Sequence, residues 1–355
     1  MRTQITLMVL MLAGSLASAQ EVRIGVFGLF HPRQLMVSAP PGPAIIVHAG
    51  QQSFAIENSS GANGVSIQSV GNELVVRCGT HSVESPELIV SSRENGPVDF
   101  LLSVAGKITR HYRGRLEIEQ ASGILIPIVS MDIETAVASV VAAESMPGAP
   151  MEALKAQAVA ARSYFAAGKG RHDDFDFCDT THCQFLREAP PPEAAAYKAT
   201  IATRGFVIAY QLHVFAAMYT RSCSGRTRTP TDIGIPVAEY PYYSVECKYC
   251  RQHPTNWKSR ISMQDAAHLR SSDDAARIEA GRRLGWNVIQ SDDFTLRKRG
   301  EEVIVEGSGQ GHGVGLCQAG ARQMAEEGAD FRQILAHYYP NITVMSLTPE
   351  STRKR

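Results

Sequence analysis

Short apolar runs, separated by clusters of Pro, Gly, Asn and Ser, follow one another from residue 21 to residue 108. Runs of this length and composition, bounded by such clusters, are typical of β-strands. The segment RGRLEIEQASGILIPIVSM then predicts a hairpin that turns at Ser122 and Gly123. We therefore predict a small strand-rich region over residues 20–108, with a role in packing or ligand display. Its clearest strand candidates are VRIGVF, PAIIVHA, ELVVRC and VDFLLSV.

The pattern changes to a helical period near Asp132. Asp132 is a suitable N-cap for the apolar segment IETAVASVVAAESM, because its carboxylate can accept from the first free backbone N–H groups. Pro147 and Gly148 interrupt the helix, and MEALKAQAVAARSYFAAG predicts a second one that ends at Gly168. Two consecutive helices with a sharp break are therefore expected in the middle of the chain.

The rest of the chain alternates between helical, extended and irregular patterns. Residues 169–190 are polar and irregular, and residues 221–260 form a long segment rich in Gly, Pro and Cys. We predict an α+β fold in which helices pack against β layers and frame a groove, with a main domain over 109–346 and a tail over 347–355. The other expected elements are a helix over Glu193–Arg204, strands in FVIAYQLHVFAAMYT, one or two helices over Asp265–Leu284, the strand EEVIVEG and a final helix after the glycine-rich turn.

The N-terminus predicts export. Arg2 precedes the apolar run Ile5–Leu16, and Ala17-Ser18-Ala19 has the small residues of a cleavage site. The run is too short to span a bilayer, so we predict a signal peptide over residues 1–19 rather than an anchor. The other interpretation is an ordinary buried N-terminal helix. With the signal peptide removed we expect no transmembrane segment, and a location in the periplasm, the cell envelope or outside the cell.

Composition narrows the function classes. Hydrophobic residues make up 44% of the 355-residue chain, which is enough for a large core and argues against disorder. Lys and Arg together number 35, as do Asp and Glu, so the chain has no overall basic field. A nucleic-acid partner is therefore not expected.

Glu144 is the main candidate for acid/base chemistry. It ends the first apolar helix, where the helix dipole favours cations and gives a carboxylate no stabilisation. Partial burial there would raise its pKa toward the range that a general acid needs. The alternative interpretation is a solvated glutamate at a helix end.

A candidate metal site lies in the segment RHDDFDFCDTTHCQF. His172, Cys178, His182 and Cys183 fall within twelve residues, and imidazole and thiolate are the usual ligands of zinc. The segment has little apolar content, so a metal would supply the free energy that orders it. The spacing also allows a Cys178–Cys183 disulfide or two unlinked thiols.

The remaining cysteines leave two interpretations open. Cys223, the pair Cys247 and Cys250, and His253 form a second group that suits either a metal site or a structural disulfide. No thioredoxin-like pattern surrounds the pair, so redox catalysis is not expected. Cys78 and Cys317 bring the total to seven, which is an odd number for a disulfide framework.

Further candidates are polar residues near these segments. His312 stands within the glycine-rich run 307–315, whose glycines permit close approach of the backbone to a ligand. Gln318 follows it and could bond to a sugar. Lys155 and Arg162, seven residues apart on one face of the second helix, either contact substrate or are simply solvated.

Four blocks of the sequence together resemble the SpoIID/LytB family. The first is VVAAESMPGAPMEALKAQAVAARSY, which is similar to the signature in which a helix-end glutamate precedes an EALKAQAVAARTY-like segment. The resemblance covers roughly residues 112–344 and follows the family's order. Cys317 stands where the family commonly has Ser, Ser224-Gly225 replaces Gly-Gly, and the Cys247/Cys250 pair occurs only in some members. The other blocks are FDFCDTTHCQF, MYTRSCSGRTRT and GHGVGLCQAGARQMAEEG.

The resemblance implies lytic cleavage of peptidoglycan, preferentially of glycan strands without stem peptides, and in some members modulation of a cell-wall amidase. It places the acid/base on Glu144 and a zinc-binding segment on His172–Cys183, where we expect structural Zn²⁺. Within the similar blocks we add Gln184 and Ser224 to the substrate-binding candidates.

Three functions therefore remain open. The first is a lytic transglycosylase with one catalytic glutamate. The second is a non-catalytic glycan-binding module that enhances an amidase. The third is a zinc hydrolase with an activated water at a three-ligand site.

Overall fold

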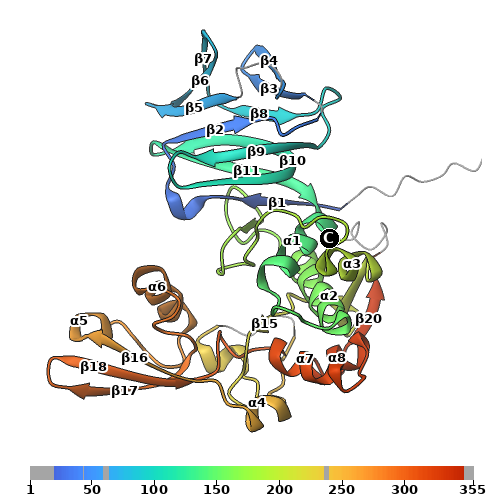
Figure 1. Cartoon of the computed structure of the whole chain (residues 1–355), viewed down its shortest axis with the longest axis vertical. Helices are drawn as coiled ribbons and strands as arrows, with labels where there is room; N and C mark the ends of the chain where they lie inside the picture. The colour runs from blue at the N-terminus through green and yellow to red at the C-terminus, as the bar shows by residue number, and fades with distance from the viewer. Residues whose placement is uncertain (1–19, 43, 59–63, 236–239, 348–355) are drawn as a thin grey trace, which may run out of the picture.

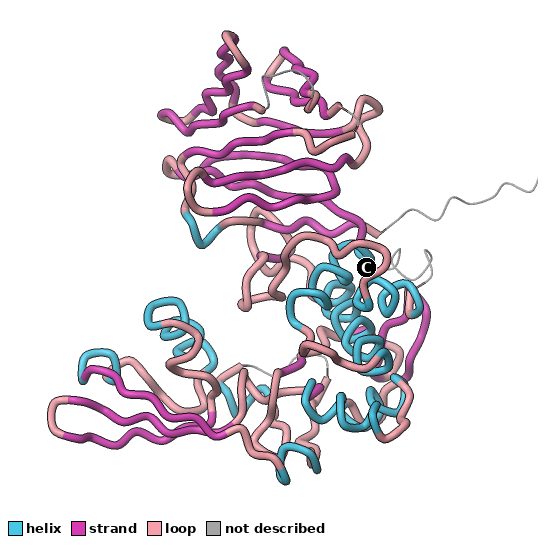
Figure 2. Tube along the Cα trace, viewed as in Figure 1, coloured by secondary structure: helices cyan, strands magenta, loops and turns pink. Residues whose placement is uncertain are grey.

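The computed structural model describes residues 20–42, 44–58, 64–235 and 240–347 (Figure 1). The predicted signal peptide and all but the first residue of the predicted tail lie outside these ranges. The chain combines a large β region with a helical region and a small arm, which confirms the α+β class (Figure 2).

The first region is a 12-stranded sheet system whose main path runs β12-β1-β11-β10-β9-β2-β5-β6-β7, with β3, β4 and β8 attached at its side. Alternating apolar residues of these strands face one core, which contains Val22, Ile24 and Phe100. The strands are β1 Glu21–Gly25, β2 Gln34–Ser38, β3 Ile45–Ala49, β4 Gln52–Ile56, β5 Val65–Val70, β6 Glu73–Cys78, β7 His81–Ser85, β8 Leu88–Ser91, β9 Val98–Val104, β10 Ile108–Ala121, β11 Ile124–Asp132 and β12 Phe177–Cys178.

Strand β10 joins two parts of this system. Residues 108–114 pair with β9, whereas residues 116–118 pair with β8. At the change of partner stands Gly114, where a Cβ atom would lie only 2.4 Å from the carbonyl oxygen of Ser130. Strand pairing therefore continues across the domain boundary predicted at residue 108, because the β9–β10 hairpin spans it.

The predicted hairpin forms from β10 and β11. Ala121 pairs with Ile124, and the two residues between them, Ser122 and Gly123, both have positive φ angles of 53° and 76°. Such angles are those of a tight hairpin turn whose twist matches the strands. The turn prediction is confirmed.

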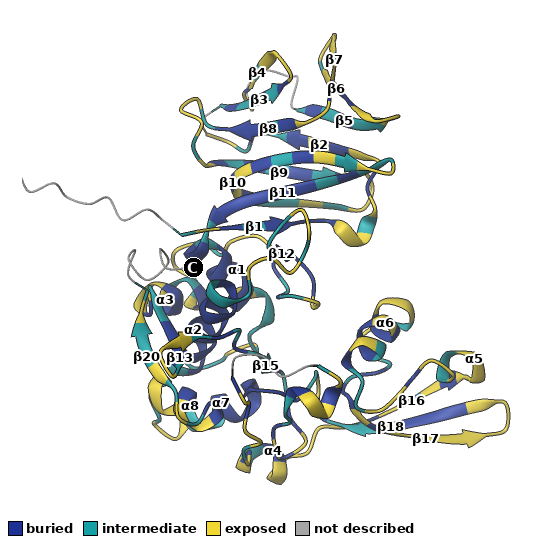
Figure 3. Ribbon diagram, turned by 180° about the vertical axis from the view of Figure 1, so that it is seen from behind, coloured by how far each residue is buried: buried dark blue, intermediate teal, exposed yellow. Residues whose placement is uncertain are grey.

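Helix α2 is the centre of the second region. It packs against α1, α3, α7, α8 and strand β13, and residues on nearly all of its faces are buried (Figure 3). Asp132 caps α1 as predicted, by accepting from the N–H groups of Glu134 and Thr135. The elements here are α1 Ile133–Glu144, α2 Met151–Ala167, α3 Ala195–Ala202, β13 Phe206–Tyr210, β14 His213–Val214, β15 Tyr219–Thr220, α4 Lys248–Gln252, β19 Leu316–Cys317, α7 Gln318–Glu326, α8 Phe331–Tyr338 and β20 Thr343–Ser346.

The third part is an arm with a small core of its own around Trp257 and Val305. Its strands pair in the order β16-β18-β17, and Figure 1 shows them projecting away from the helices. The predicted strand EEVIVEG is β18, the central strand. The sequences of its neighbours β16 and β17 have no clear apolar alternation, so these two strands were not predicted. The elements are β16 Asn256–Ser262, α5 Met263–Ala266, α6 Asp274–Leu284, β17 Asp293–Arg299 and β18 Glu302–Ser308; the single-turn helices η1 Gly28–Phe30 and η2 Pro230–Ile233 lie outside the arm.

Candidate functional site

The carboxyl group of Glu144 points into the protein at the last residue of α1. One of its oxygens, Oε1, accepts from the backbone N–H of Phe185 at 2.7 Å. The other, Oε2, accepts from the hydroxyl of Tyr219. The residue as a whole remains partly exposed. These contacts exclude the alternative of a freely solvated helix-end glutamate.

This environment changes the acidity of Glu144. Burial of the carboxyl group raises its pKa from an ordinary 4.5 to about 7, and the hydrogen bonds from Tyr219 and Phe185 reduce the rise. No other carboxylate in the described part of the chain contributes to the shift. Glu144 can therefore exist in both protonation states near neutral pH, as a residue that first donates and then accepts a proton must.

Tyr219 connects Glu144 to Gln184. Its hydroxyl lies 3.0 Å from Oε1 of Gln184, so the single phenolic proton has two acceptors within reach. Gln184 is buried and donates through Nε2 to the carbonyl oxygen of Ala161 in α2, which fixes the orientation of its amide. Gln184 was predicted to bind substrate; instead it is enclosed and orients Tyr219.

Two side chains hold the end of α1. Nε2 of Gln318 donates to the carbonyl oxygen of Glu144 at 3.1 Å, and Arg221 donates to the carbonyl oxygens of Glu144 and Ser145, at 3.3 Å each. A cation there is favoured by the negative end of the helix dipole. Gln318 was predicted to bond to a sugar, but it is buried and its amide is used to position the backbone of Glu144.

His312 is also committed to internal contacts. Its Nδ1 accepts from the N–H of Val314 at 3.0 Å, and the ring makes a second hydrogen bond with the backbone of Tyr219. Burial lowers the pKa of His312 to about 4, so the ring is neutral at pH 7. His312 was predicted to contact substrate; its ring nitrogens make hydrogen bonds within the protein that support the segment carrying Tyr219, and substrate contact stays a prediction.

The glycine-rich run packs against the chain itself. A Cβ atom on Gly315 would lie 1.9 Å from the carbonyl oxygen of Met218, and one on Gly311 would lie 2.6 Å from Oγ1 of Thr220. Both glycines also have positive φ angles. We expected this run to approach a ligand, and instead it lets residues 307–315 lie directly on the segment 218–222.

The candidate metal ligands of the 169–194 loop converge. One ligand atom from each of His172, Cys178, His182 and Cys183 lies within 4.8 Å of the others. The close approach of the two Sγ atoms lowers the pKa of the Cys178 thiol and raises that of Cys183. Both thiols are free, so the alternative of a disulfide between them does not hold. Two imidazoles and two thiols fit the tetrahedral donor set of zinc.

Comparisons with known proteins bear on this arrangement. A family model described as Stage II sporulation protein matches residues 122–210, which include α1, Glu144 and the metal loop. The Stage II sporulation protein D of Bacillus amyloliquefaciens is 25% identical over 259 residues, which cover 61% of this chain and 75% of that protein. Residues 122–210 thus match a SpoIID domain, and the chain is similar to members of the SpoIID/LytB family.

Two other relatives differ in how much they share with this chain. An uncharacterised protein of Brachyspira hyodysenteriae is 28% identical over 268 residues, which cover 66% of this chain and 72% of that protein. A protein of Bacillus subtilis named amidase enhancer is 38% identical, but only over 63 residues, which are 18% of this chain and 9% of that protein.

Arg162, predicted to contact substrate or to be solvated, is enclosed in the protein. Its side chain has no exposed surface and forms a two-pronged ion pair with Glu134 of α1, at 2.9 and 2.6 Å. It also donates to the carbonyl oxygens of Thr200 and Phe206. The prediction failed because seven-residue spacing identifies a shared helix face, but not whether that face is buried.

The remaining substrate candidates lie outside the contacts around Glu144. Lys155 pairs with Glu152 at 2.6 Å on the surface of α2. Ser224 is exposed and its hydroxyl donates to the carbonyl oxygen of Ser308. Substrate contact by these two residues stays a prediction.

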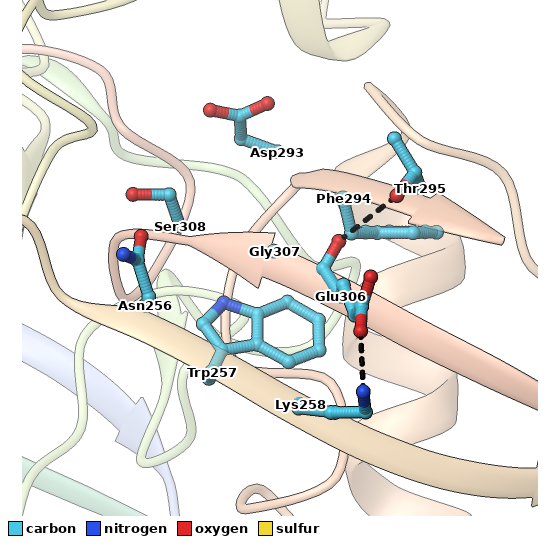
Figure 4. A pocket seen from close by; sticks show the side chains of 9 residues that line it. All are labelled: Asn256, Trp257, Lys258, Asp293, Phe294, Thr295, Glu306, Gly307 and Ser308. Atoms are coloured by element: carbon cyan, nitrogen blue, oxygen red, sulfur yellow. Dashed lines mark hydrogen bonds and ion pairs between the residues drawn. The ribbon is translucent and has the colours of Figure 1, made fainter.

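A cavity of the described residues lies elsewhere. It has a volume of about 520 Å³ and opens on the arm, between β16, β17 and β18 (Figure 4). Trp257 lines it, with Nε1 bonded to Ser291, and Lys258 pairs with Glu306 at its edge. None of the residues that contact Glu144 lines this cavity, so the cavity and the Glu144 site are separate.

Sequence reasoning missed Tyr219, Arg221 and the N–H of Phe185. Tyr219 and Arg221 fall within a segment that resembles a family block, which was the only signal available for them. Their contacts with Glu144 join residues 75 or more positions apart, so no local pattern predicts them.

Within the described residues no helix is long and apolar enough to cross a membrane.

Proposed function

We propose that this protein is a peptidoglycan lytic transglycosylase with Glu144 as its only acid/base. The substrate is the linkage between N-acetylmuramic acid and N-acetylglucosamine, in glycan strands that lack stem peptides. The predicted export would place the enzyme in the cell envelope or outside the cell, where this polymer lies.

The observation that carries the proposal is the carboxyl group of Glu144, which accepts from Tyr219 and from the N–H of Phe185 and whose pKa is raised by burial to about 7. Hydrolytic glycosidases use two carboxyl groups, about 5–10 Å apart, one of them to activate water or to form a covalent intermediate. A lytic transglycosylase needs one, because the nucleophile is a hydroxyl of the sugar itself.

In this reaction Glu144 both donates a proton and takes one back. Protonated Glu144 gives its proton to the glycosidic oxygen, which leaves with N-acetylglucosamine as the C1–O bond of N-acetylmuramic acid breaks. The C6 hydroxyl of the same sugar attacks C1, and ionised Glu144 takes the proton of that hydroxyl. The products are a 1,6-anhydro end and a free sugar end, and no water is consumed. Attack within one sugar benefits from proximity.

Tyr219 suits both states of Glu144. While Glu144 is protonated, the Tyr219 hydroxyl can donate to Oε1 of Gln184, which leaves the carboxyl proton free for the substrate. Once the proton has moved, the hydroxyl can turn to the new carboxylate. Rotation of one hydroxyl thus supplies a donor only when negative charge develops, which favours the transition state over the ground state.

The loop that carries the candidate metal ligands also carries Phe185, whose N–H binds the other carboxyl oxygen of Glu144, Oε1. Phe185 follows the ligand Cys183 by two residues, so a zinc ion held by His172, Cys178, His182 and Cys183 would fix the N–H that binds Oε1. Four protein ligands leave no open position for a water, which is the pattern of structural zinc. We therefore propose that zinc orders the loop, and we rank a zinc hydrolase below the transglycosylase.

A second candidate function is that of a non-catalytic glycan-binding enhancer of a cell-wall amidase. It is favoured by the similarity of a 63-residue segment to the protein named amidase enhancer. It does not explain why a buried glutamate should have a pKa near neutrality.

The experiment compares products made from denuded glycan strands by the wild type, by Glu144→Gln and by Glu152→Gln. Glutamine can keep the contacts at position 144, with its oxygen accepting from Phe185 and its amide donating to Tyr219. We expect 1,6-anhydro ends from the wild type and from the Glu152→Gln control, whose side chain pairs with Lys155, accepts from the N–H of Phe331 and makes none of the contacts of Glu144. Glu144→Gln should lose activity by a factor of about 10² to 10⁴.

Mass spectrometry of the products separates the alternatives. Anhydro ends that persist in Glu144→Gln would refute the assignment of the acid/base. Hydrolysed ends that disappear with a chelator would support the zinc hydrolase instead. Amidase enhancement that survives in Glu144→Gln, with no cleavage by any variant, would support the binding module.

A further inference from the structure

Four cysteines that are far apart in sequence meet in the core beneath the candidate site. The Sγ atoms of Cys223, Cys247, Cys250 and Cys317 all lie within 4.8 Å of one another, and each residue is at most 1% exposed. We call these residues the four-cysteine cluster. Cys223 follows β15, Cys247 and Cys250 flank the start of α4, and Cys317 ends β19 directly before α7.

Cys317, rather than His253, completes this group. His253 is exposed, bonded to the carbonyl oxygen of Tyr249 and stacked on the Tyr249 ring. Cys317 is fully buried, with its Sγ 3.5 Å from that of Cys250. The second group expected from the sequence therefore exists, but with four sulfur donors and no histidine.

The sulfur positions do not fit disulfides. A disulfide joins its sulfur atoms at about 2.05 Å, and all four thiols here are free. A tetrahedron of sulfurs around one zinc ion, with Zn–S bonds of about 2.3 Å, has S–S edges of about 3.8 Å. The observed separations, from 3.5 Å up to the limit of 4.8 Å, are close to that edge and leave no room for a larger iron–sulfur cluster.

Hydrogen-bond donors surround the sulfurs, as thiolates bound to a metal require. The N–H of Cys223 donates to Sγ of Cys317 at 3.4 Å. The hydroxyls of Ser222 and Tyr338 lie 3.5 Å from the Sγ atoms of Cys250 and Cys247, respectively. Four thiolates around Zn²⁺ carry a net charge of −2, which these donors would offset.

The backbone of α7 leaves space for the four-cysteine cluster at Gly320. A Cβ atom on Gly320 of α7 would lie 2.5 Å from Sγ of Cys247 and 2.0 Å from the hydroxyl of Tyr338. Any larger residue would therefore displace the cluster or the helix. The close packing of α7 on the cluster depends on this glycine.

We propose that the four-cysteine cluster is a second, structural zinc site, separate from the site in the 169–194 loop. It ties α4 to the parallel pair β15–β19, next to residues that hold Glu144. Arg221 lies two residues before Cys223, and Gln318 directly follows Cys317. The inference concerns metal binding and folding, and it does not depend on the proposed catalytic activity.

The test measures zinc per chain in the protein purified without reducing agent, together with the double variants Cys247→Ser/Cys250→Ser and Cys178→Ser/Cys183→Ser. We expect about two zinc ions per wild-type chain and about one in each double variant. Cys78→Ser is the matched control, since Cys78 lies in β6 and belongs to neither group, and it should retain both ions.

X-ray absorption at the zinc edge of the wild type gives an answer even where a variant fails to fold. Two sites, one with four sulfurs and one with two sulfurs and two nitrogens, give an average of about three sulfurs and one nitrogen per zinc. One zinc per chain with equal sulfur and nitrogen would overturn the proposal. So would iron in place of zinc, or a disulfide within the cluster detected by peptide mapping of the unreduced wild type.

Discussion

The two cysteine-containing groups lie close in sequence to different residues that contact Glu144, and they are built in different ways. The loop group draws all four residues from the segment His172–Cys183. The four-cysteine cluster draws its residues from positions 223 to 317, in three separate segments of the chain. Phe185, which donates to the carboxyl group, follows the loop group by two residues, whereas Arg221 and Gln318, which hold the end of α1, are near Cys223 and Cys317 of the cluster in sequence.

The difference teaches how a metal can act on a site. A group within one short segment orders that segment alone, because its removal frees a loop with little apolar content. A group that joins distant elements restricts the fold itself, because it closes large loops in the unfolded chain. Loss of the loop group should therefore affect catalysis more than stability, and loss of the cluster should do the reverse.

The largest effect is expected from Cys247→Ser/Cys250→Ser. Structural zinc contributes about 10 kcal/mol or more to folding in small zinc-finger peptides, and this cluster ties three elements of the helical region. We expect the cooperative unfolding of that region to be lost or moved far below the wild-type midpoint, as followed by denaturant titration with far-UV circular dichroism. An unchanged midpoint would show that the four thiols are ordinary core side chains.

Arg162→Met removes a buried ion pair that joins separate elements without a metal. Arg162 joins α1, α2 and the start of β13, and its loss leaves Glu134 buried without a counter-ion. We expect a loss of about 3–5 kcal/mol in the free energy of unfolding. Zinc content should stay at the wild-type value. The double variant Arg162→Met/Glu134→Gln should recover part of the loss, because no charge then remains buried.

Cys178→Ser/Cys183→Ser tests the loop group. Freeing the loop removes the N–H of Phe185 from Oε1 of Glu144, and a hydrogen bond to a charged group is worth about 1.5–3 kcal/mol. We expect activity on denuded glycan strands to fall about 10- to 100-fold while the unfolding midpoint moves little. Hydrogen exchange should show faster exchange confined to residues 169–190. Faster exchange throughout the helical region would contradict the comparison.

Tyr219→Phe tests the electrostatics of Glu144 itself. The Tyr219 hydroxyl stabilises the ionised carboxylate, so its removal raises the pKa of Glu144 above about 7. Because the protonated form starts the reaction, wild-type activity should decline as pH rises through about 7, and in the variant this decline should move to higher pH. Maximal activity should also fall, since the developing carboxylate loses a donor. A decline that moves to lower pH would contradict the proposed proton path.

The raised pKa of Glu144 should also make the stability of the folded chain depend slightly on pH. Its pKa is higher in the folded chain than in the unfolded one, so the folded state binds more protons between pH 4.5 and about 7. This contribution to stability is complete below pH 4.5 and is lost as pH rises through about 7. Glu144→Gln removes it, so the difference in unfolding midpoint between the variant and the wild type should grow in favour of the variant from pH 4.5 to pH 8.

The smallest effect is expected from Lys155→Ala. Its ion pair with Glu152 lies on the surface of the same helix that buries Arg162. Surface pairs contribute about 0–1 kcal/mol, so the unfolding midpoint should hardly change. If activity falls while stability stays constant, Lys155 contacts substrate as the sequence suggested. If neither changes, Lys155 is a solvated residue.

Local features of the chain followed from its sequence. Asp132 begins α1, the break at Pro147 and Gly148 separates α1 from α2, and Ser122-Gly123 forms the hairpin turn. The loop group was also recognisable, because its four ligands are close in sequence. These features depend on backbone preferences and on contacts between near neighbours, which a local pattern of residues determines.

The tertiary structure alone decided which side chains meet Glu144 and which are enclosed. Tyr219, Arg221 and Gln318 reach α1 from segments 75 to 174 positions away, and Cys317 joins the four-cysteine cluster from another strand. Arg162, predicted at the surface or at substrate, is buried because other elements cover its face of α2. Such contacts arise from how separate elements pack, and nothing in the spacing of residues along one element specifies the partner that another element brings.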